Sequence, residues 1–416
     1  MLLYHLNEFK NAALWPAHMW SEANNIFLNA FPWNDNPLTR LASASNEVLE
    51  RTTRVYSRPS FGIKKIEKNG KSIFVEEQVI REKPFCTLKK FVRKNKEGNI
   101  VLEEEPLVLI VPPLSGHFST LLRDTIATTL IDHNVVVLDW HDARMVPVKK
   151  GEFSLETYVE YLLEFIEFLG TNIHIMAVCQ PAVPVLMAVS ILASRNSPNQ
   201  PLSMILMGGP IDARVNPGKV NQFALDHSMD WFKRNIIATI PLYYPGADRE
   251  VCPGFIMLNG FMALNLERHQ EASFNLFLDL VKGDLEHAES HRKFYDEYRS
   301  VMDIPAEYFL ESIQLIFKEF VLPLGNLTWN GHPIKPEVIK KTALMTIEGE
   351  LDDISPLGQT FAAHDLCSHI PTSMKSHYVQ EGVGHYGIFN GRRWRTQIYP
   401  QIKSFIVKNS IRDNIF

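Results

Sequence analysis

The sequence has little of what would set it apart from ordinary globular proteins. It holds only four cysteines in 416 residues, and no two of them follow C-x-x-C spacing, which argues against a disulfide framework or a metal centre. No stretch approaches the roughly 18 consecutive apolar residues of a membrane span. The net charge of −5 is not that of a nucleic-acid-binding protein or of a polybasic membrane anchor. We therefore expect no metal, no cofactor, no transmembrane segment and no nucleic-acid partner.

The first twenty residues also lack the pattern of a secretory signal peptide. Glu8 and Lys10 interrupt what would have to be its apolar stretch, and no small-residue cleavage site follows cleanly. We expect a cytoplasmic protein. In that compartment a free, reduced thiol persists.

What the chain does contain is the composition of a large globular protein, with 45% hydrophobic and 21% charged residues. Its length exceeds one ordinary domain and favours a large core with an insertion. We predict four segments. They are a helical opening with a strand hairpin over residues 1–100, a first core part over 101–215, a mainly helical cap over 216–335, and a second core part over 336–416.

Strand and helix patterns alternate through both core parts, which predicts an α/β fold with a mostly parallel sheet and helices on both faces. The hairpin of the first segment turns at Asn69-Gly70. We expect strands at 107–111, 135–138, 173–178, 204–207, 343–347 and near 376–380, and helices at about 154–169, 356–367 and 392–408. The cap is rich in aromatic residues, among them Phe255, Phe261, Phe294, Tyr295, Tyr298, Tyr308 and Phe309.

Cys179 stands where the buried strand over 173–178 passes into an apolar helix. Pro181 and Pro184 mark the helix start, because proline is accepted in the first helical turn. In α/β hydrolases a nucleophile sits at such a corner within G-x-S-x-G. Here the window is Ala-Val-Cys-Gln-Pro, so cysteine replaces serine and Pro181 replaces the second glycine. The alternative is a buried thiol that acts as a small hydrophobe.

Two later loops carry the residues that such a nucleophile requires. The strand over 343–347 leads to Gly349-Glu-Leu-Asp352-Asp353, and the next strand leads to Gly-Val-Gly-His385-Tyr-Gly. The chain order nucleophile, acid, histidine is that of the α/β hydrolases. Asp352 is the expected acid, with Asp353 as the alternative, and Asp352 could instead stabilise the N-terminus of the following helix.

Long segments resemble a known family. VPPLSGHFSTLLRDT, LDWHDARMVPVKKGEFSLETYVEYL, FYDEYRSVMDIPAEYFLESI, ALMTIEGELDDIS and GVGHYGIFNGRRW are similar to the intracellular poly(3-hydroxybutyrate) depolymerases, bacterial enzymes that mobilise storage polyester granules. The resemblance covers essentially the whole chain. It implies an α/β-hydrolase fold, a catalytic triad at Cys179, Asp352 and His385, no cofactor, and a polyester granule as partner.

For the oxyanion of each tetrahedral intermediate we expect two backbone N–H donors. One is Gln180, the residue after the nucleophile, and the other is Leu114 or Ser115, in the loop after the first core strand. His117 could polarise the ester or pack the loop. Trp140 could line the site or belong to the core.

The expected reaction is cleavage of the ester bonds of amorphous polyester through an acyl-thioester, in the cytoplasm at storage granules. One alternative is a synthase-like acyltransferase that uses hydroxyacyl-CoA. Synthases of that kind resemble G-x-C-x-G at the corner, whereas this chain has Ala177 and Pro181. Another alternative is a catalytically silent granule-associated protein. The cap aromatics could form a polymer groove or the cap's own small core, and the oligomeric state stays open.

Overall fold

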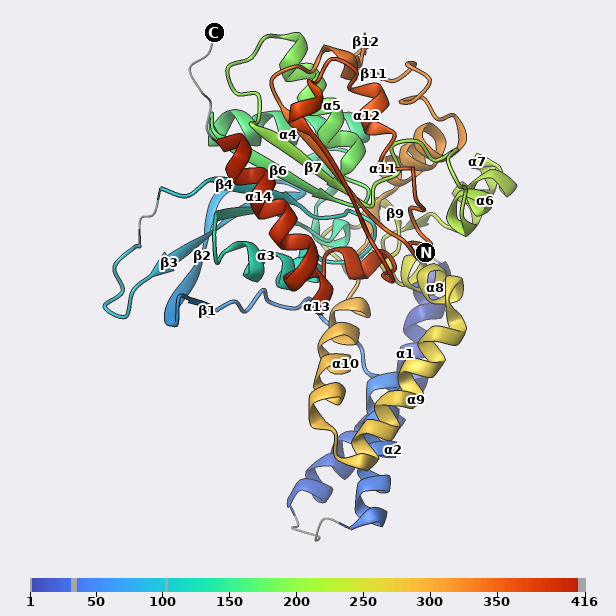
Figure 1. Cartoon of the computed structure of the whole chain (residues 1–416). Helices are drawn as coiled ribbons and strands as arrows, with labels where there is room; N and C mark the ends of the chain where they lie inside the picture. The colour runs from blue at the N-terminus through green and yellow to red at the C-terminus, as the bar shows by residue number, and fades with distance from the viewer. Residues whose placement is uncertain (1, 31–35, 102–103, 411–416) are drawn as a thin grey trace.

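The computed structural model describes residues 2–30, 36–101 and 104–410 and is built on one nine-stranded sheet (Figure 1). Three antiparallel strands form one edge, and the six strands from β5 to β14 run parallel. The order is β1-β2-β3-β5-β4-β6-β7-β13-β14, the crossed arrangement of the α/β-hydrolase fold. The strands are β1 (Lys65–Lys68), β2 (Lys71–Lys83), β3 (Cys86–Lys94), β4 (Leu107–Val111), β5 (Asn134–Trp140), β6 (Ile173–Val178), β7 (Ser203–Met207), β13 (Ala343–Gly349) and β14 (Lys375–Gln380).

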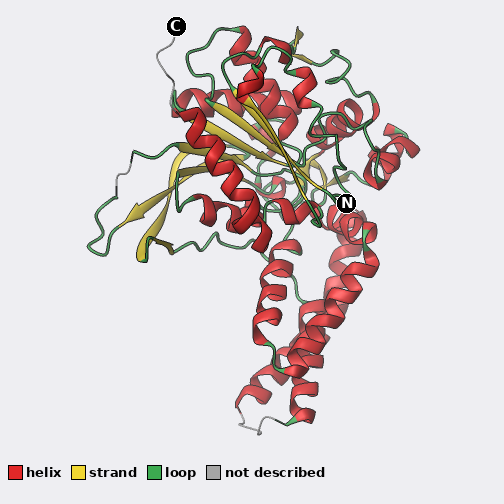
Figure 2. Cartoon of the chain, viewed as in Figure 1, coloured by secondary structure: helices red, strands yellow, loops and turns green. Residues whose placement is uncertain are grey.

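Helices cover both faces of this sheet, as the strand–helix alternation predicts (Figure 2). Successive residues of β4 illustrate the division, because Leu109 packs in the core beneath α4 and α5, whereas Ile110 packs on the opposite face with α3 and α14. α5 has no charged residue and is buried on all sides except its last position. The helices are α3 (Arg123–Thr129), α4 (Leu155–Leu169), α5 (Ala182–Ser194), α12 (Ala363–Leu366), α13 (Gly391–Arg393) and α14 (Tyr399–Ser410).

Several predicted elements are confirmed with their ends. β6 spans the predicted residues 173–178, and α4 begins after Ser154, whose side chain accepts a hydrogen bond from the Thr157 N–H, and ends at Gly170. Asn69 and Gly70 both adopt positive φ and join β1 to β2. The predicted helix over 392–408 is present as α13, one π-helical turn and α14.

Two predictions differ from the structure. β3 was not predicted, because Lys89 and Lys90 interrupt its apolar pattern; the Lys89 ammonium is nevertheless accommodated by an ion pair with buried Asp139 at 2.9 Å. The helix expected over 356–367 is reduced to α12, and residues 357–362 form turns. The buried carboxylate of Glu348 accepts hydrogen bonds from three backbone N–H groups in this stretch, which holds it in turns instead of a helix.

Segment 216–335 is mainly helical, as predicted, with a small three-stranded sheet and a two-stranded hairpin. Its α9 and α10 extend away from the sheet together with the two N-terminal helices, forming a four-helix arm (Figure 1). The arm consists of α1 (Leu2–Ala30), α2 (Pro37–Thr53), α9 (Leu266–Lys282) and α10 (Leu285–Tyr298). The remaining elements are α6 (Lys219–Asp226), α7 (Met229–Asn235), α8 (Gly254–Leu264), α11 (Ala306–Glu311), β8 (Ala238–Thr239), β9 (Glu250–Cys252), β10 (Ile304–Pro305), β11 (Thr328–Trp329) and β12 (His332–Pro333).

The division of the chain into four segments stays a prediction, since the single sheet takes strands from three of them. Within the described residues, every helix is too short or too polar to cross a bilayer.

Candidate active site

Cys179 occupies a sharp corner between β6 and α5. Its φ is +69°, a left-handed conformation that costs a non-glycine residue on the order of 1–3 kcal/mol. The corner is fixed by its neighbours, because the Cys179 N–H donates to the Met207 carbonyl at 2.7 Å and the Ala182 N–H donates to the Cys179 carbonyl at 3.1 Å. The thiol is half-buried. This is the geometry of a nucleophile elbow.

Glycines from the neighbouring strand make room for the corner. A Cβ on Gly209 would overlap Ala182 Cβ and lie 2.8 Å from the Cys179 carbonyl oxygen. At Gly208, which has a φ of +56°, a Cβ would lie 2.7 Å from Ile388 and 3.1 Å from the His385 ring. The close approach that the elbow motif usually takes from its own second glycine is thus provided here from β7, and Pro181 can begin the helix.

His385 and Asp352 meet beside Cys179. The His385 Nδ1–H donates to Asp352 Oδ2 at 2.7 Å, and both side chains are buried. Burial disfavours the charged imidazolium, but the charge of Asp352, the charge of Cys179 and a hydrogen bond to each outweigh burial and hold the pKa of His385 well above its usual value. The three residues from three loops therefore form one connected constellation.

The two adjacent aspartates have different partners. Asp352 Oδ1 accepts hydrogen bonds from the backbone N–H groups of Ile354 at 2.9 Å and Ser355 at 2.8 Å, which leaves Oδ2 for His385. Asp353 instead accepts a hydrogen bond from the Asn265 side chain, at the junction of α8 and α9. The geometry favours Asp352 over Asp353 as the partner of the histidine.

The predicted oxyanion donors lie on two sides of Cys179. Among the described residues, no backbone carbonyl accepts the N–H of Gln180, and the Gln180 side chain donates to Ser312 Oγ at 3.2 Å. In the loop after β4, Ser115 lines the cavity over Cys179, whereas the Leu114 side chain is packed in the core. The choice between these two N–H groups stays a prediction.

His117 is buried, and its Nε2 lies 3.0 Å from the Tyr298 carbonyl. This contact requires the proton on Nε2, because a carbonyl only accepts. Burial lowers the pKa of His117 to about 4, against a smaller opposing effect of the hydrogen bond to Tyr298. A neutral ring whose one N–H is already engaged has no donor left for an oxyanion, so the loop-packing alternative is the better supported one.

Trp140 does not line the cavity. Its ring is fully buried against Tyr158 and its Nε1–H donates to the Pro112 carbonyl at 3.0 Å. It therefore belongs to the core, where it supports the start of the loop that carries Leu114 and Ser115.

The cavity over the thiol has a volume of about 130 Å³ and a largely apolar wall. α8 contributes Met257 and Phe261, and the segment after α11 contributes Ser312, Ile313 and Phe317. Of the cap aromatics named from the sequence, Phe261 and Phe309 line the cavity, whereas Tyr308 is buried in the core below. The wall residue Tyr386 was not predicted, although it directly follows His385.

A larger surface cavity of about 600 Å³ lies beyond β5 and contains neither Cys179 nor His385. Its cationic lining includes Arg58 and Arg144, which are paired with Asp139 and Asp142. The chemistry of the constellation therefore belongs to the smaller apolar cavity.

Comparison with known proteins finds a family model that matches just under half of the chain. The family model of the PHB de-polymerase C-terminus matches residues 208–410, a range that includes Asp352 and His385 and begins after Cys179. No curated protein matches the sequence.

Solved structures with a similar trace are hydrolases of low sequence identity. The monoacylglycerol lipase of Paleococcus ferrophilus is 13% identical over 73% of this chain and 96% of its own, with a TM-score of 0.42. The 2-hydroxy-6-oxo-6-phenylhexa-2,4-dienoate hydrolase of Rhodococcus sp. strain RHA1 is 15% identical over 80% and 100%, with a TM-score of 0.39. An esterase from Thermogutta terrifontis is 13% identical over 83% and 98%, with a TM-score of 0.41.

These three likenesses are too distant to bear on the reaction. The strand order, the elbow and the family match do bear on it. On those grounds the chain is a PHB depolymerase-like α/β hydrolase, a carboxylic ester hydrolase.

Proposed function

We propose that this protein is an intracellular poly(3-hydroxybutyrate) depolymerase in which Cys179 is the nucleophile, His385 the general base and Asp352 the residue that orients the histidine. The observation that carries the proposal is the buried His385, which is hydrogen-bonded to Asp352 at 2.7 Å and lines the same cavity as Cys179. The family match supports the polyester as substrate. The granule as partner and the cytoplasm as location are part of the proposal and rest on the resemblance of the sequence.

In the first half-reaction, His385 Nε2 takes the thiol proton of Cys179 and the sulfur attacks the ester carbonyl carbon. The oxyanion that forms is stabilised by the N–H of Gln180 together with that of Leu114 or Ser115. When the intermediate collapses, the C–O bond breaks and His385 returns the proton to the leaving alkoxide. The products are a 3-hydroxyacyl thioester on Cys179 and a shortened polymer with a free hydroxyl end.

In the second half-reaction, His385 takes a proton from water, and the resulting oxygen nucleophile attacks the thioester carbonyl. The C–S bond then breaks, the proton returns to the sulfur, and a carboxylic acid leaves. Asp352 keeps the Nδ1–H of His385 in place in both half-reactions, so that Nε2 always faces the reacting atoms. The largely apolar wall of the cavity suits the uncharged polyester, because outside the catalytic residues it offers no charged group to desolvate.

The test is to add purified protein to native amorphous granules and to follow turbidity and released 3-hydroxybutyrate, with Cys179→Ala as the comparison. The proposal expects loss of turbidity with the unmodified protein and none with the variant. A protein that leaves granules intact but consumes 3-hydroxybutyryl-CoA would be a synthase-like acyltransferase. Degradation unchanged by Cys179→Ala would contradict the proposed mechanism.

A further inference from the structure

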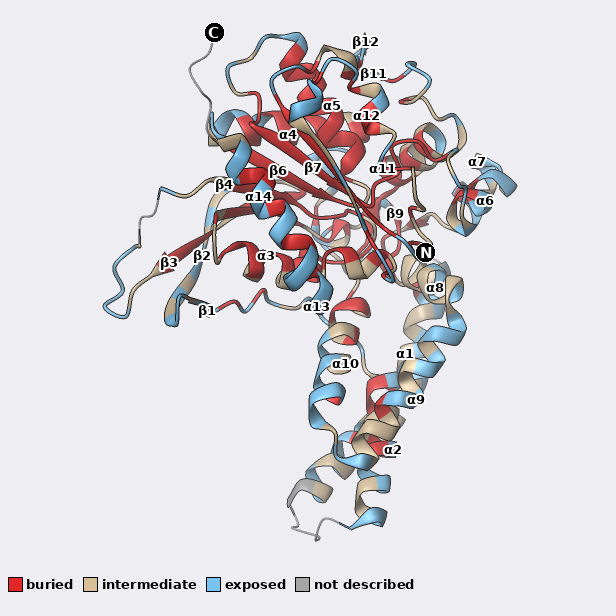
Figure 3. Ribbon diagram, in the orientation of Figure 1, coloured by how far each residue is buried: buried red, intermediate tan, exposed pale blue. Residues whose placement is uncertain are grey.

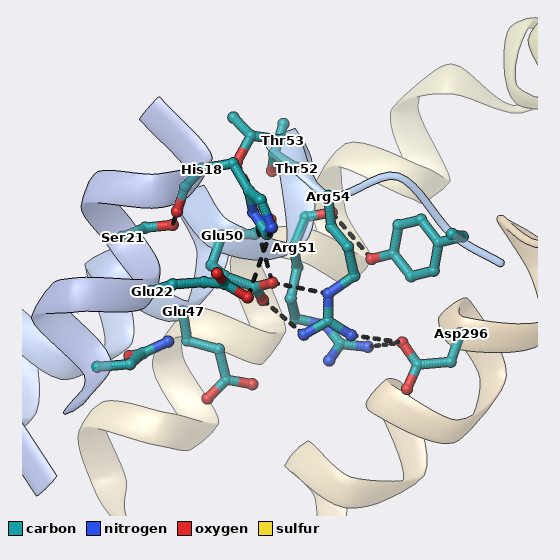
Figure 4. Close-up of polar contacts among 12 residues, drawn as sticks. His18, Ser21, Glu22, Glu47, Glu50, Arg51, Thr52, Thr53, Arg54 and Asp296 are labelled. Carbon is teal, nitrogen blue, oxygen red and sulfur yellow. Dashed lines mark hydrogen bonds and ion pairs between the residues drawn. The ribbon is translucent and has the colours of Figure 1, made fainter. Parts of the chain in front are cut away.

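Helix α1 turns its polar side inward. Ser21 is fully buried, and its carbonyl accepts a hydrogen bond from the Asn46 side chain of α2 at 2.8 Å. The same Asn46 amide donates to Asn25 Oδ1 at 2.7 Å, and His18 lies 3.7 Å from Glu50 of α2 (Figure 4). The contacts that hold α1 to α2 are therefore substantially polar.

The outward side of α1 carries several exposed apolar and aromatic side chains, together with the exposed side chains of His5 and Glu22. Phe9 is 76% exposed and Trp20 is 60% exposed. Residues 11–21 contain no aspartate, glutamate, lysine or arginine. We call the following seven exposed side chains the α1 apolar face: Leu2, Leu6, Phe9, Trp15, Met19, Trp20 and Ile26. An exposed apolar patch of this extent marks an interaction surface.

Ion pairs join α2 to α10 within the arm. On α10, Arg292 makes a two-point ion pair with Glu47 of α2, with both distances at 2.6 Å. Arg51 of α2 pairs with Asp296 of α10 at 2.6 Å, and Arg54 pairs with Glu50 along α2 itself (Figure 4). Turning α1 about its axis would bury Phe9 and Trp20 at the cost of the Asn46 hydrogen bonds.

The N-terminal end of α1 lies beside α8, the helix that walls the catalytic cavity. Tyr4 packs edge-on against Phe255 of α8 with ring centroids 5.7 Å apart, and Met257 and Phe261 of the same helix line the cavity over Cys179. The exposed Tyr243 also lies beside α1, where its hydroxyl donates to Glu8. One end of the α1 apolar face is therefore close in the fold to the helix that walls the cavity.

The spread of the apolar side chains around α1 favours an extended surface over another helix. Paired helices meet along a narrow seam of two positions per heptad. Here Trp15, Met19 and Ile26 lie to one side of the row that holds Phe9 and Trp20, so the apolar side chains spread over about half of the circumference. At about 1.5 Å per residue, the 29 residues of α1 extend over roughly 40 Å.

We propose that the α1 apolar face is the surface by which the protein lies on amorphous polyester, with Phe9, Trp15 and Trp20 inserted among the apolar chains. The identity of that surface rests on the proposed function. The face itself does not depend on Cys179 chemistry, so the two proposals can fail separately.

The test measures sedimentation of the full-length protein with protein-free amorphous poly(3-hydroxybutyrate) granules, in a Cys179→Ala background that removes turnover. The variant Phe9→Ser/Trp15→Ser/Trp20→Ser should bind at least about tenfold more weakly, since each side chain loses apolar burial. A matched control, Val148→Ser/Phe168→Ser/Val407→Ser, changes three exposed apolar residues outside the arm and should bind like its parent. Binding should not fall in 0.5 M salt, because no ion pair is involved.

Each outcome decides the matter. The proposal is overturned if the α1 variant binds within about twofold of the parent, because burial of three aromatic side chains should contribute more than that. It is also overturned if the parent itself does not bind. Loss of a dimer in light scattering without loss of granule binding overturns it as well, since that would make the face an interface between copies. With Cys179 restored, the α1 variant should hydrolyse a soluble 3-hydroxybutyrate ester at the parental rate. Granule binding without any ester hydrolysis would contradict the proposed function and leave the surface standing.

Discussion

The sheet buries its apolar residues, whereas the arm leaves many of them exposed (Figure 3). In β4 to β7 nearly every side chain is buried. In the arm, polar groups and ion pairs hold the helices together while aromatic residues of α1 face outward. The sheet uses apolar burial to fix atoms at the active site, whereas the arm leaves its apolar side chains available for contact. Changes in the two regions should therefore affect different properties.

The largest effect is expected at the elbow. Cys179→Ala should lower the rate of ester hydrolysis by about 10⁴-fold or more, since loss of a nucleophile removes the whole covalent pathway. Hydrolysis of a soluble 3-hydroxybutyrate ester measures this, and granule sedimentation should be unchanged. A residual rate within tenfold of the parent would exclude Cys179 as the nucleophile.

The next effect separates the adjacent aspartates. Asp352→Asn should reduce kcat by about 10²- to 10⁴-fold, because an amide no longer fixes the tautomer and charge of His385. Asp353→Asn is the matched control, since this carboxylate contacts Asn265, and it should stay within about threefold in kcat by the same reasoning. Equal losses in both variants would contradict the assignment of Asp352.

The packing beneath the elbow gives a stability effect. Gly209→Ala should lower the free energy of unfolding by about 3 kcal/mol, because its Cβ would overlap Ala182. Gly260→Ala, in α8, meets no atom within 4 Å and should be neutral or stabilising by about 0.5–1 kcal/mol. Urea unfolding compares the two variants. An unchanged free energy of unfolding in Gly209→Ala would mean that the backbone at the elbow shifts to make room for the added methyl group.

Buried histidines in the sheet region predict a loss of stability in acid. Burial lowers the pKa of His117, His133 and His174 to about 4. The unfolded chain therefore binds these protons first, and the free energy of unfolding falls as the pH drops from about 6.5 to about 4. His174→Gln should reduce the fall between pH 7 and pH 5 by about 2 kcal/mol. An unchanged fall in urea unfolding would show that His174 is protonated in the folded protein.

The smallest effect is expected in the arm. Arg292→Gln removes a partly exposed ion pair with Glu47 and should cost no more than about 1 kcal/mol. Lys293→Gln, whose ammonium is exposed and 3.8 Å from Glu289, should cost less. Thermal unfolding measures both. A loss above about 2 kcal/mol for Arg292→Gln would mean that the arm depends on ion pairs as strongly as the sheet depends on packing.

The sequence predicts the parts of the fold in which local pattern and tertiary environment agree. β6, α4 and the Cys179 corner follow from apolar runs, a serine cap and two prolines. The sequence does not predict residues 357–362, because their conformation is set by Glu348, a residue on another element. β3 was missed for the same reason, since Lys89 is accommodated by Asp139 of the adjacent strand.

The candidate site was predictable in its chain order but not in its contacts. Their positions in the loops after two strands identified Asp352 and His385 as candidates. Distinguishing Asp352 from Asp353 required the contacts with His385 and Asn265. The role of Gly209 depends on the approach of Ala182, which no local pattern records. The α1 apolar face was not predicted, because a run of helix formers does not reveal which side of the helix packs against α2.

The different exposure of the four cysteines allows folded molecules to be counted by thiol labelling. Cys86, Cys252 and Cys367 are buried, and burial raises their thiol pKa values, that of Cys367 to about 12. Cys179 alone among the four is partly accessible. A thiol-alkylating label should therefore add once per folded chain and four times per unfolded chain. Intact-mass measurement of the first addition would give the fraction of chains with a reactive Cys179. It needs neither substrate nor an engineered cysteine.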